Sequence, residues 1–406
     1  MSAKNPQLRR SIGLLGKNTV DLLLQVHEDS LWVLENMGVG CKQPEIQAAF
    51  RQHEPDGKAI IYEDRVYITS ELVKDCLSTV PGVAEFFVPL NSFFIGGTAP
   101  YVYDDDAGQG GILPTAEHVA RIAQIAESQA VVAGMGRGVK IKDEVEQMNT
   151  MAAHCAKPLY FAVTSDASLD RARQLYNERG NIMVAFCLTR PVLQVNENFS
   201  DDFVKVVNAG LPVFISAMPM ASISAPYCYN GILTMTHAEA LFGICALQLL
   251  NPGTTVIHAG FPTIADPRFD YNPNYGLRSH FLLNILQAHL NLILDIPTFQ
   301  SIATTNEEHP TQRALDDART GQAMALKFGF HMMRHPFGFL RHLIDFSFLK
   351  LEKAIKIAET VTPDDAPEIE MPTYDERGMQ SIQRIGLGMY MDDPLTTANI
   401  GRVFVD

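Results

Sequence analysis

The chain has 406 residues, 47% hydrophobic and 19% charged, which is enough to bury one large α/β core with added elements. Its formal net charge of -14 and its pI near 5.3 exclude the basic face that nucleic acid or an anionic membrane surface would require. Six scattered cysteines without a C-x-x-C pair indicate reduced thiols rather than a disulfide framework.

The N-terminal sequence MSAKNPQLRR lacks the apolar segment of a signal peptide. No run approaches the roughly 20 apolar residues that we expect of a membrane-spanning helix. These features predict a cytoplasmic protein that does not enter a membrane.

Residues 1–90 differ in pattern from the rest and predict a small N-terminal α+β accessory region. Apolar side chains in residues 19–39 recur at the spacing of an amphipathic helix. Residues 58–81 predict a short hairpin around Glu63 and Asp64, followed by a helix from Ser70.

Short β-rich runs alternate with helical patterns from about residue 91. The eight runs are 93–97, 130–135, 158–164, 181–189, 211–219, 254–262, 296–305 and 328–336. This alternation predicts an α/β fold, a (β/α)8 TIM-type barrel over residues 91–360, with residues 361–406 as a C-terminal extension packed on it. An open, doubly wound sheet is the alternative, but GMGRG at 134–138 lacks the glycine spacing of a dinucleotide-binding loop.

Several helix ends are predicted by small polar residues and by glycines. We expect Thr115, Ser168 and Ser200 to cap helix N-termini, because their side chains accept hydrogen bonds from free backbone N–H groups. Gly180 and Gly210 stand where a left-handed residue commonly follows a helix.

The C-terminal ends of the strands are where a barrel of this kind carries its active site. The residues there are rich in aromatic, methionine and histidine side chains and poor in clustered carboxylates. A magnesium site would need converging carboxylates, and a phosphate site would need glycine amides with a lysine. His331 and His335 are four residues apart, yet they follow an apolar strand rather than lie on a helix, so we expect no metal site.

Aromatic residues at the expected mouth either pack its rim or form a cage for a methylated ammonium through cation–π attraction. The cage candidates are Tyr101, Tyr103, Tyr227, Tyr229 and Phe261. Small residues and two methionines stand at the end of the fifth run and just after it, and methionines form soft apolar walls. We expect Met218, Met220 and Ser222 to line a hollow at this position.

The segment ISAMPMASISAPYCYNGILTMTHAEALFGICALQLLNPGTTVIHAG, residues 215–260, resembles the trimethylamine:corrinoid methyltransferase family. The matching pairs are Met218-Pro219, Ala225-Pro226, Ala238-Glu239, Gln248-Leu249 and Pro252-Gly253. Residues 265–269, 304–322 and 385–397 also look like family segments. The resemblance covers roughly residues 93–400 and is strongest over 211–322.

This resemblance implies a (β/α)8 barrel that moves a methyl group from an N-methylated amine to the Co(I) of a corrinoid. The corrinoid would be carried by a cognate partner protein and not bound permanently, and the family implies a homo-oligomer. Trimethylamine members use pyrrolysine, whereas every residue here is standard, so the resemblance implies the branch that demethylates quaternary amines such as glycine betaine. The tail departs from the family, because DDPLTT has no histidine ahead of its threonines.

The chemistry of such a transfer explains the missing acid–base pair. A quaternary nitrogen leaves as a neutral tertiary amine, so the protein must mainly position the substrate, exclude water and hold the cation. We therefore predict no catalytic residue by name. Met218, Met220 and Ser222 would face the corrinoid. Candidates for a substrate carboxylate or a corrinoid side chain are His258, Arg268, His331, Arg334 and His335.

Two other functions remain open at this point. A Schiff-base lyase or aldolase would need a lysine at a strand end, and Lys140, Lys157 and Lys327 are poorly placed for that. A barrel that only binds a methylated amine or a partner protein is the second. Arg268 and Glu239 also have structural explanations. Arg268 would then form a salt bridge with Asp266 or Asp270, and Glu239 would pack within its helix with a hydrogen-bonded carboxylate.

Overall fold

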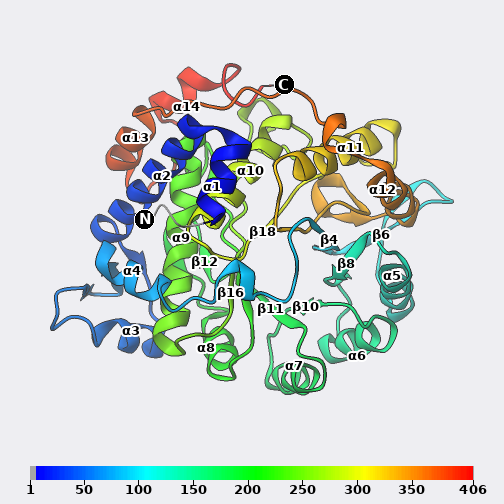
Figure 1. Cartoon of the computed structure of the whole chain (residues 1–406), viewed down its shortest axis with the longest axis horizontal. Helices are drawn as coiled ribbons and strands as arrows, with labels where there is room; N and C mark the ends of the chain where they lie inside the picture. Colours follow the sequence, from blue (N-terminus) through cyan, green and yellow to red (C-terminus); the bar gives the residue numbers. More distant parts are fainter. Residues whose placement is uncertain (1–5, 406) are drawn as a thin grey trace.

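The computed structural model describes residues 6–405, and its centre is a ring of eight parallel strands (Figure 1). The strands are β4 (Ser92–Ile95), β8 (Val132–Met135), β10 (Leu159–Phe161), β11 (Ile182–Phe186), β14 (Val213–Ile215), β16 (Val256–His258), β18 (Phe299–Gln300) and β19 (Met332–Met333). They pair in chain order from β4 to β16, and β19 joins β18 to β4. A parallel bridge between His258 and Thr298 closes the ring.

One helix follows each strand and covers the outside of the ring (Figure 1). These helices are α5 (Ala116–Ser128), α6 (Glu144–His154), α7 (Asp166–Arg179), α8 (Ser200–Asn208), α9 (Tyr229–Leu250), α10 (Arg278–Ile293), α11 (Gln312–Lys327) and α12 (Phe348–Thr360). The predicted (β/α)8 barrel is therefore confirmed, and each of the eight β-rich runs contains or overlaps one of its strands.

The predicted helix ends are partly confirmed. Thr115 is the N-cap of α5, and Gly180 adopts a φ of 70° just after α7. The N-cap of α7 is Ser165, whose hydroxyl accepts a hydrogen bond from the Ser168 N–H, so the expectation for Ser168 is wrong. Ser200 is the first residue of α8 rather than its cap.

The inside of the barrel is packed with side chains, so it is not a pore. A single apolar cluster there contains Phe94, Tyr160, Met183, Phe214, Ile257, Ala259, Phe299 and Met332, together with Phe86 and Val88 from the segment before β4. The rings of Tyr160, Phe214 and Phe299 meet edge to face, with centroids 5.0–5.6 Å apart. Residues from different strands thus build one aromatic layer, on which any cavity at the mouth must rest.

The N-terminal residues form helices and strands beside the barrel. They are α1 (Pro6–Leu15), α2 (Lys17–Asn36), β1 (Val39–Gly40), α3 (Pro44–Arg51), β2 (Ala59–Tyr62), β3 (Arg65–Ile68) and α4 (Ser70–Leu77). The predicted hairpin is confirmed, because β2 and β3 pair antiparallel across Glu63 and Asp64. The sheet continues through β1 to β13 (Gln194–Val195) and β12 (Thr189–Arg190), which belong to the loop after β11. The accessory strands are therefore joined to a loop at the barrel mouth.

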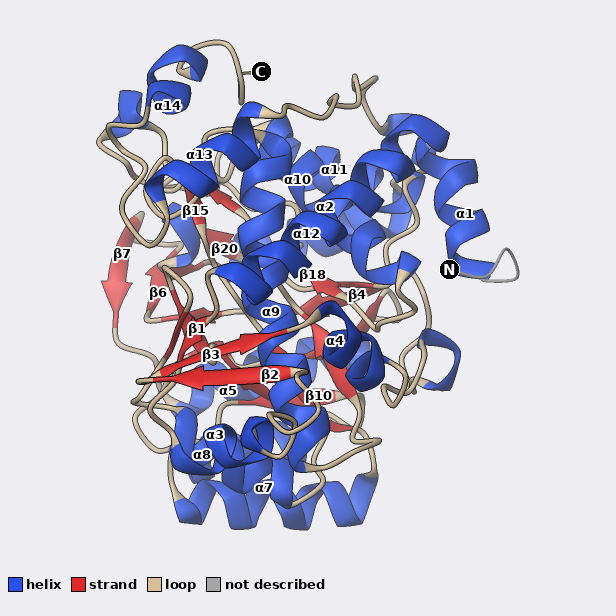
Figure 2. Cartoon of the chain, turned by 90° about the vertical axis from the view of Figure 1, so that its left-hand side faces the viewer, coloured by secondary structure: helices blue, strands red, loops and turns tan. Residues whose placement is uncertain are grey.

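Helix α9 is 22 residues long and apolar enough, by length and composition, to cross a membrane. It is 94% buried over its most apolar window, packed between α2, α3 and α4 on one side and the barrel on the other (Figure 2). This is the environment of a core helix, and it explains why α9 is so apolar. No apolar run of this length was expected from the sequence.

Short elements extend the mouth beyond the ring. Two parallel pairs, β5 (Thr98–Ala99) with β9 (Gly138–Val139) and β15 (Met220–Ala221) with β17 (Thr263–Ile264), prolong neighbouring barrel strands. The others are β6 (Tyr101–Asp104), β7 (Gln109–Ile112), β20 (Phe339–Leu340), β21 (Asp345–Phe346), η1 (Val83–Glu85), η2 (Pro267–Phe269), η3 (Arg341–Leu343), η4 (Pro363–Asp365), α13 (Arg377–Ile385) and α14 (Pro394–Asn399). The C-terminal segment packs on the start of α9, where Asn399 donates to the Tyr227 carbonyl at 2.8 Å.

Candidate functional site

A cavity of about 230 Å³ lies at the C-terminal ends of the barrel strands. It is lined from β4, β8, β10, β11, β14 and β19 or from the residues just after them. Pockets that hold drug-sized ligands measure about 300–1,000 Å³, so this one favours a smaller molecule. Its rim is open to solvent, because Thr164 and Cys187 are exposed.

The cavity lining is rich in aromatic side chains. The aromatic side chains that line it are Tyr160, Phe161, Phe186, Phe199 and Phe214. The Tyr160 hydroxyl accepts a hydrogen bond from the Gly97 N–H at 2.5 Å, and burial raises the pKa of Tyr160 to about 12. Tyr160 is therefore a neutral phenol at physiological pH. Gly97 has a φ of 77°, and a Cβ there would approach His335 to 2.8 Å, which explains why glycine stands at this close contact.

Arg334 follows β19 and lies almost wholly buried in the cavity wall, with 6% of its surface exposed. Its Nη1 donates weakly to the Ser216 hydroxyl at 3.4 Å and its Nη2 to the Ala259 carbonyl at 3.2 Å. Its buried Nε has no partner within the described chain. Burial lowers the pKa of Arg334, yet a guanidinium stays charged in proteins, so this site holds an incompletely satisfied positive charge.

Arg137 follows β8 and lines the same cavity, half-buried. Within residues 6–405, neither Arg137 nor Arg334 forms an ion pair with a carboxylate. Buried charges are normally paired, and arginine is well suited to bind carboxylates. The two guanidiniums therefore give the cavity lining positive charge that no salt bridge of the described chain offsets.

His335 completes the lining beside Arg334. Its Nδ1 lies 2.6 Å from the Ser301 hydroxyl. Burial and the nearby Arg334 charge lower the pKa of His335 well below its usual value of 6.5, so the imidazole is neutral at physiological pH. His335 can orient a polar group, but it does not supply an acidic proton near pH 7.

A family model described as trimethylamine methyltransferase (MTTB) matches residues 1–386. The chain belongs to the trimethylamine methyltransferase family. The resemblance seen in residues 93–400 is thereby confirmed. This family member is 23% identical over 402 residues to glycine betaine methyltransferase of Desulfitobacterium hafniense, covering 91% of this chain and 81% of the relative.

Two further relatives come from Eubacterium limosum. Its proline betaine:corrinoid methyltransferase is 22% identical over 324 residues, covering 71% of this chain and 65% of the relative. Its L-carnitine:corrinoid methyltransferase is 23% identical over 282 residues, covering 60% of this chain and 56% of the relative. This trimethylamine methyltransferase family member thus spans less than two thirds of both.

Solved structures give weaker likenesses. The hydroxylamine complex of MtmB has a TM-score of 0.48 at 10% identity, covering 94% of this chain and 84% of that chain. Dihydropteroate synthase from Xanthomonas albilineans in complex with 7,8-dihydropteroate has a TM-score of 0.40 at 14% identity, covering 71% and 97%. The barrel of this family member is established by its own strand pairing.

Three of the residues expected at the site lie together. Arg334 and His335 line the cavity, and the ring of Phe261 lies behind them, 5.0 Å from the Arg334 guanidinium carbon and 5.8 Å from the His335 ring. Phe261 also stacks on Tyr275 at 5.6 Å, and His280 meets it edge to face at 5.5 Å. Phe261 therefore supports the arginine from a second layer and does not line the cavity.

His258 lies in a chain of three buried histidines. The Gly260 N–H donates to His258 Nδ1 at 3.1 Å, which places the His258 proton on Nε2. That nitrogen lies 3.0 Å from His237 Nδ1, and His237 Nε2 lies 3.1 Å from His27 Nδ1. Each imidazole thus donates to the next, and the chain ties β16 to α9 and α2. His258 faces outward from the barrel and holds these layers together.

The four tyrosines lie outside the cavity lining. Tyr101 begins β6, and the Tyr103 hydroxyl is bonded to His309 Nδ1 at 2.7 Å. Tyr227 and Tyr229 both meet the ring of Phe404, at 4.9 Å and 4.8 Å. They pack the rim and the C-terminal tail, which was the alternative role for aromatic residues at the mouth.

Arg268 and Glu239 take their alternative roles. Arg268 forms a bidentate salt bridge with the fully buried Asp266, with its Nη2 2.6 Å from Asp266 Oδ2. Glu239 accepts hydrogen bonds from the Thr189 hydroxyl and the Leu193 N–H, both at 3.0 Å. Burial raises the pKa of Glu239 to about 7. It fastens the loop after β11 to helix α9.

His331 lies at the opposite, N-terminal end of the barrel. Its Nε2 donates to the Val88 carbonyl at 2.8 Å, and its ring meets Phe86 edge to face. The apolar run at 328–336 begins before the strand does, so His331 precedes β19 instead of following it. The expectation that it joins Arg334 and His335 at the mouth is corrected by this boundary.

The segment after β14 offers less surface than expected for a corrinoid. Met218 is 40% exposed, and Met220 is half-buried in β15. Ser222 is fully buried, and its hydroxyl donates to the Ala265 carbonyl at 2.5 Å. Ser222 therefore shapes the turn, with a φ of 74°, and Met218 is the one of the three that faces solvent.

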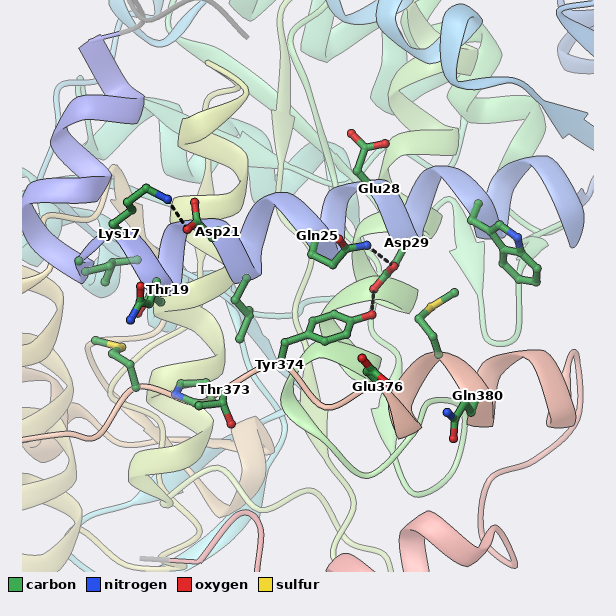
Figure 3. A pocket seen from close by; sticks show the side chains of 18 of the residues that line it. Lys17, Thr19, Asp21, Gln25, Glu28, Asp29, Thr373, Tyr374, Glu376 and Gln380 are labelled. Carbon is green, nitrogen blue, oxygen red and sulfur yellow. Dashed lines mark hydrogen bonds and ion pairs between the residues drawn. The ribbon is translucent and has the colours of Figure 1, made fainter.

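A larger hollow of about 1,300 Å³ lies outside the barrel, between α2 and residues 371–383 (Figure 3). Its central carboxylate, Asp29, accepts hydrogen bonds from the Tyr374 hydroxyl at 2.7 Å and from Gln25 Nε2 at 3.0 Å. Lys17, paired with Asp21, is the single basic residue in its described lining. Its polar centre is already satisfied, so we place the chemistry in the barrel cavity.

Proposed function

We propose that this protein transfers a methyl group from a small quaternary amine that also bears a carboxylate to the Co(I) of a corrinoid carried by a partner protein. The observation that carries this proposal is the presence of two guanidiniums, those of Arg137 and Arg334, in the lining of an aromatic-walled cavity of about 230 Å³, neither of them in a salt bridge within the described chain. The substrates named for the three relatives, glycine betaine, proline betaine and carnitine, all combine these two charges.

The cavity lining supplies groups for both charges of such a molecule. A carboxylate would accept charged hydrogen bonds from Arg334 and Arg137. A quaternary ammonium has no N–H to donate, so it is held by aromatic faces such as those of Tyr160 and Phe214. The guanidiniums would repel a methylated amine without a carboxylate, which disfavours trimethylamine and choline.

The ionisation of the lining favours a quaternary nitrogen. Tyr160 and His335 are both neutral near pH 7 and neither is an effective acid there. A quaternary amine that loses a methyl group departs as a neutral tertiary amine, which needs no proton. The residues of this chain therefore bind, orient and keep water away from the reacting carbon.

A corrinoid in the Co(I) state would supply the nucleophile that accepts the methyl group. The loops that follow the barrel strands fit a large, apolar partner surface, because five large apolar side chains are exposed on them. These are Ile112, Leu113, Met218, Phe269 and Ile344. We propose that the corrinoid protein docks on this face, which includes Met218, the exposed one of the three residues that the sequence analysis expected to face the corrinoid.

The Schiff-base alternative finds no support at this site. Lys157 donates to the carbonyls of Ala126, Gln129 and Val132, each at 2.8 Å, at the N-terminal side of the barrel. Lys350 is fully buried, and burial lowers its pKa to about 8, but it donates to the Phe339 carbonyl and does not line the cavity.

The experiment is methylation of cobalt under anaerobic conditions. The purified chain is mixed with a Co(I) corrinoid protein and with glycine betaine, proline betaine, carnitine, choline or trimethylamine, and cobalt absorbance is followed. We expect methylation from the carboxylated quaternary amines and little from the other two. Binding of glycine betaine in calorimetry without any cobalt methylation would instead indicate a non-catalytic binder.

A further inference from the structure

Cys187 is the exposed member of the six cysteines, all of which lie in the described part of the chain. The other five are at most 3% exposed. Cys187 directly follows β11 and lines the barrel cavity together with Arg137 and Arg334. The chain thus places its accessible thiol at the mouth of the site where the substrate would enter.

The cavity contains a second feature that points to an anion at this position. Only 6% of the Arg334 surface is exposed, and its Nε has no hydrogen-bond partner within residues 6–405. Arg137 and Arg334 line the same cavity as Cys187, and the Glu144 carboxylate also acts on Arg137, though outside salt-bridge distance. An anionic group built on the Cys187 sulfur would therefore find two guanidiniums in the same cavity, of which Arg334 has an unpartnered Nε and neither forms a salt bridge within the described chain.

We propose that Cys187 is an oxidative modification site, at which a hydroperoxide produces an anionic sulfur group that Arg137 and Arg334 hold and that closes the cavity. In the first step the thiol and hydrogen peroxide give a sulfenic acid and water: an S–O bond forms, the O–O bond breaks, and sulfur loses two electrons. A second equivalent of peroxide gives the sulfinic acid and water, and this acid ionises to the sulfinate. Two equivalents of a small thiol reverse the first step and yield a disulfide and water.

The consequence for substrate rests on the function proposed above. A sulfinate at Cys187 would compete with the substrate carboxylate for the same guanidiniums and would take up space in a cavity of only about 230 Å³. Conversely, bound glycine betaine would cover the thiol and slow its modification. Methyl transfer to Co(I) requires reducing conditions, so this thiol would shut the site when those conditions are lost.

The test uses the full reduced chain and reads the thiol itself. Alkylation by anionic iodoacetate and by neutral iodoacetamide is measured at each cysteine by peptide mass spectrometry, with glutathione as the reference thiol. We expect the iodoacetate-to-iodoacetamide rate ratio at Cys187 to exceed that of glutathione by about ten-fold, because the guanidiniums steer anions. The ratio should fall toward that of glutathione in Arg137→Gln.

A second arm exposes the chain to hydrogen peroxide with dimedone, which traps sulfenic acid. We expect an adduct at Cys187, slower adduct formation with glycine betaine present, and loss of glycine betaine binding in calorimetry after conversion to the sulfinate. The five buried cysteines are internal controls, since their labelling would report unfolding. Equal oxidation of all cysteines, a Cys187 rate ratio equal to that of glutathione, or unchanged binding by the sulfinate form would overturn the proposal.

The experiments test the proposed methyl transfer and the Cys187 modification site independently. If no amine methylates cobalt while Cys187 is oxidised selectively and Arg137→Gln lowers the iodoacetate ratio, the modification site stands without the proposed activity. If betaines methylate cobalt and Cys187 shows no preference for iodoacetate, the activity stands and the modification site is wrong.

Discussion

The Arg334 guanidinium carbon lies 5.0 Å from the centre of the Phe261 ring, which is not part of the cavity lining. A cation held by an aromatic face keeps its charge without a carboxylate neighbour. Phe261 is in turn stacked on Tyr275, so the arginine rests on a packed support. This arrangement stabilises the guanidinium, whose Nη atoms make only long hydrogen bonds to Ser216 and Ala259 and whose Nε has no partner in the described chain.

Removing that charge should weaken binding of a carboxylated substrate. Arg334→Gln should lower glycine betaine affinity by about 10- to 150-fold, since a hydrogen bond to a charged group contributes about 1.5–3 kcal/mol. Calorimetry measures this loss. The matched control is Arg121→Gln, because Arg121 also lies over a phenylalanine, Phe348 at 4.0 Å, but on the outer helices. Equal losses in the two variants would refute a role for Arg334 in binding.

The aromatic side should determine the affinity for the ammonium end. Phe214→Leu keeps an apolar residue but removes the ring, and cation–π contacts contribute about 0.5–2 kcal/mol, so affinity should fall by about 2- to 30-fold. Phe299→Leu is the control, because Phe299 belongs to the same interior cluster but does not line the cavity. If both variants bind glycine betaine equally well, the ammonium is held elsewhere.

Acid should destabilise the fold through its buried histidines. Burial lowers the folded-state pKa of His27 and His289 to about 4 and of His258 and His280 to about 3, whereas unfolded histidine titrates near 6.5. The unfolded chain therefore binds more protons below pH 6.5, and the free energy of unfolding should fall as pH decreases from 7 toward 4. Urea unfolding at several pH values measures this slope.

His280 allows a direct test that the buried histidines cause this dependence of stability on pH. Both ring nitrogens of His280 are buried and have no partner in the described chain, among the rings of Phe261 and Tyr275. His280→Phe should reduce the slope below pH 6 by about 1.4 kcal/mol per pH unit, the value for one proton. His154→Gln, at an exposed position, should leave it unchanged. A slope that His280→Phe does not alter would contradict this assignment.

Glu239 should make the fold less stable as pH rises, the opposite of the effect of the buried histidines. Burial raises its folded-state pKa from 4.5 to about 7, so its contribution to stability is full below pH 4.5 and is lost as pH rises to about 7. Glu239→Gln should remove this loss and stabilise the protein at pH 8 by on the order of 3 kcal/mol. Glu239→Ala leaves the Leu193 N–H without its acceptor and should destabilise at every pH. Equal pH profiles for wild type and Glu239→Gln would disprove the shift.

The barrel could be predicted because its signals are local. Each strand is a short apolar run and each helix has its own periodicity, so the eight-fold alternation is visible without any knowledge of contacts. Arg334 and His335 could be placed for the same reason, since they directly follow a strand. Arg268 follows a strand as well, but its salt bridge with Asp266 was weighed only as an alternative.

The remaining site residues depend on facts that a linear reading does not contain. Tyr160 and Phe214 lie within strands, and the face of the strand that each occupies decides whether it reaches the cavity. Arg137 was considered only as part of a glycine-rich turn, and Cys187 only as one of six reduced thiols. For His331, an error of three residues in a strand boundary moved the side chain to the other end of the barrel. In a barrel with short strands, the position of a residue along its strand determines which end of the barrel its side chain reaches.

The pairing of β1 with β13 limits how far the chain can be shortened from its N-terminus. A truncated chain beginning at Ser92 would leave the edge of β13 unpaired, and unpaired edges associate with other chains. The same cut would remove His27 from the end of its histidine chain and expose α9 where α2 covers it. Aggregation is therefore the expected fate of the isolated barrel, and the elements from α1 to α4 belong to the same folding unit as the barrel strands.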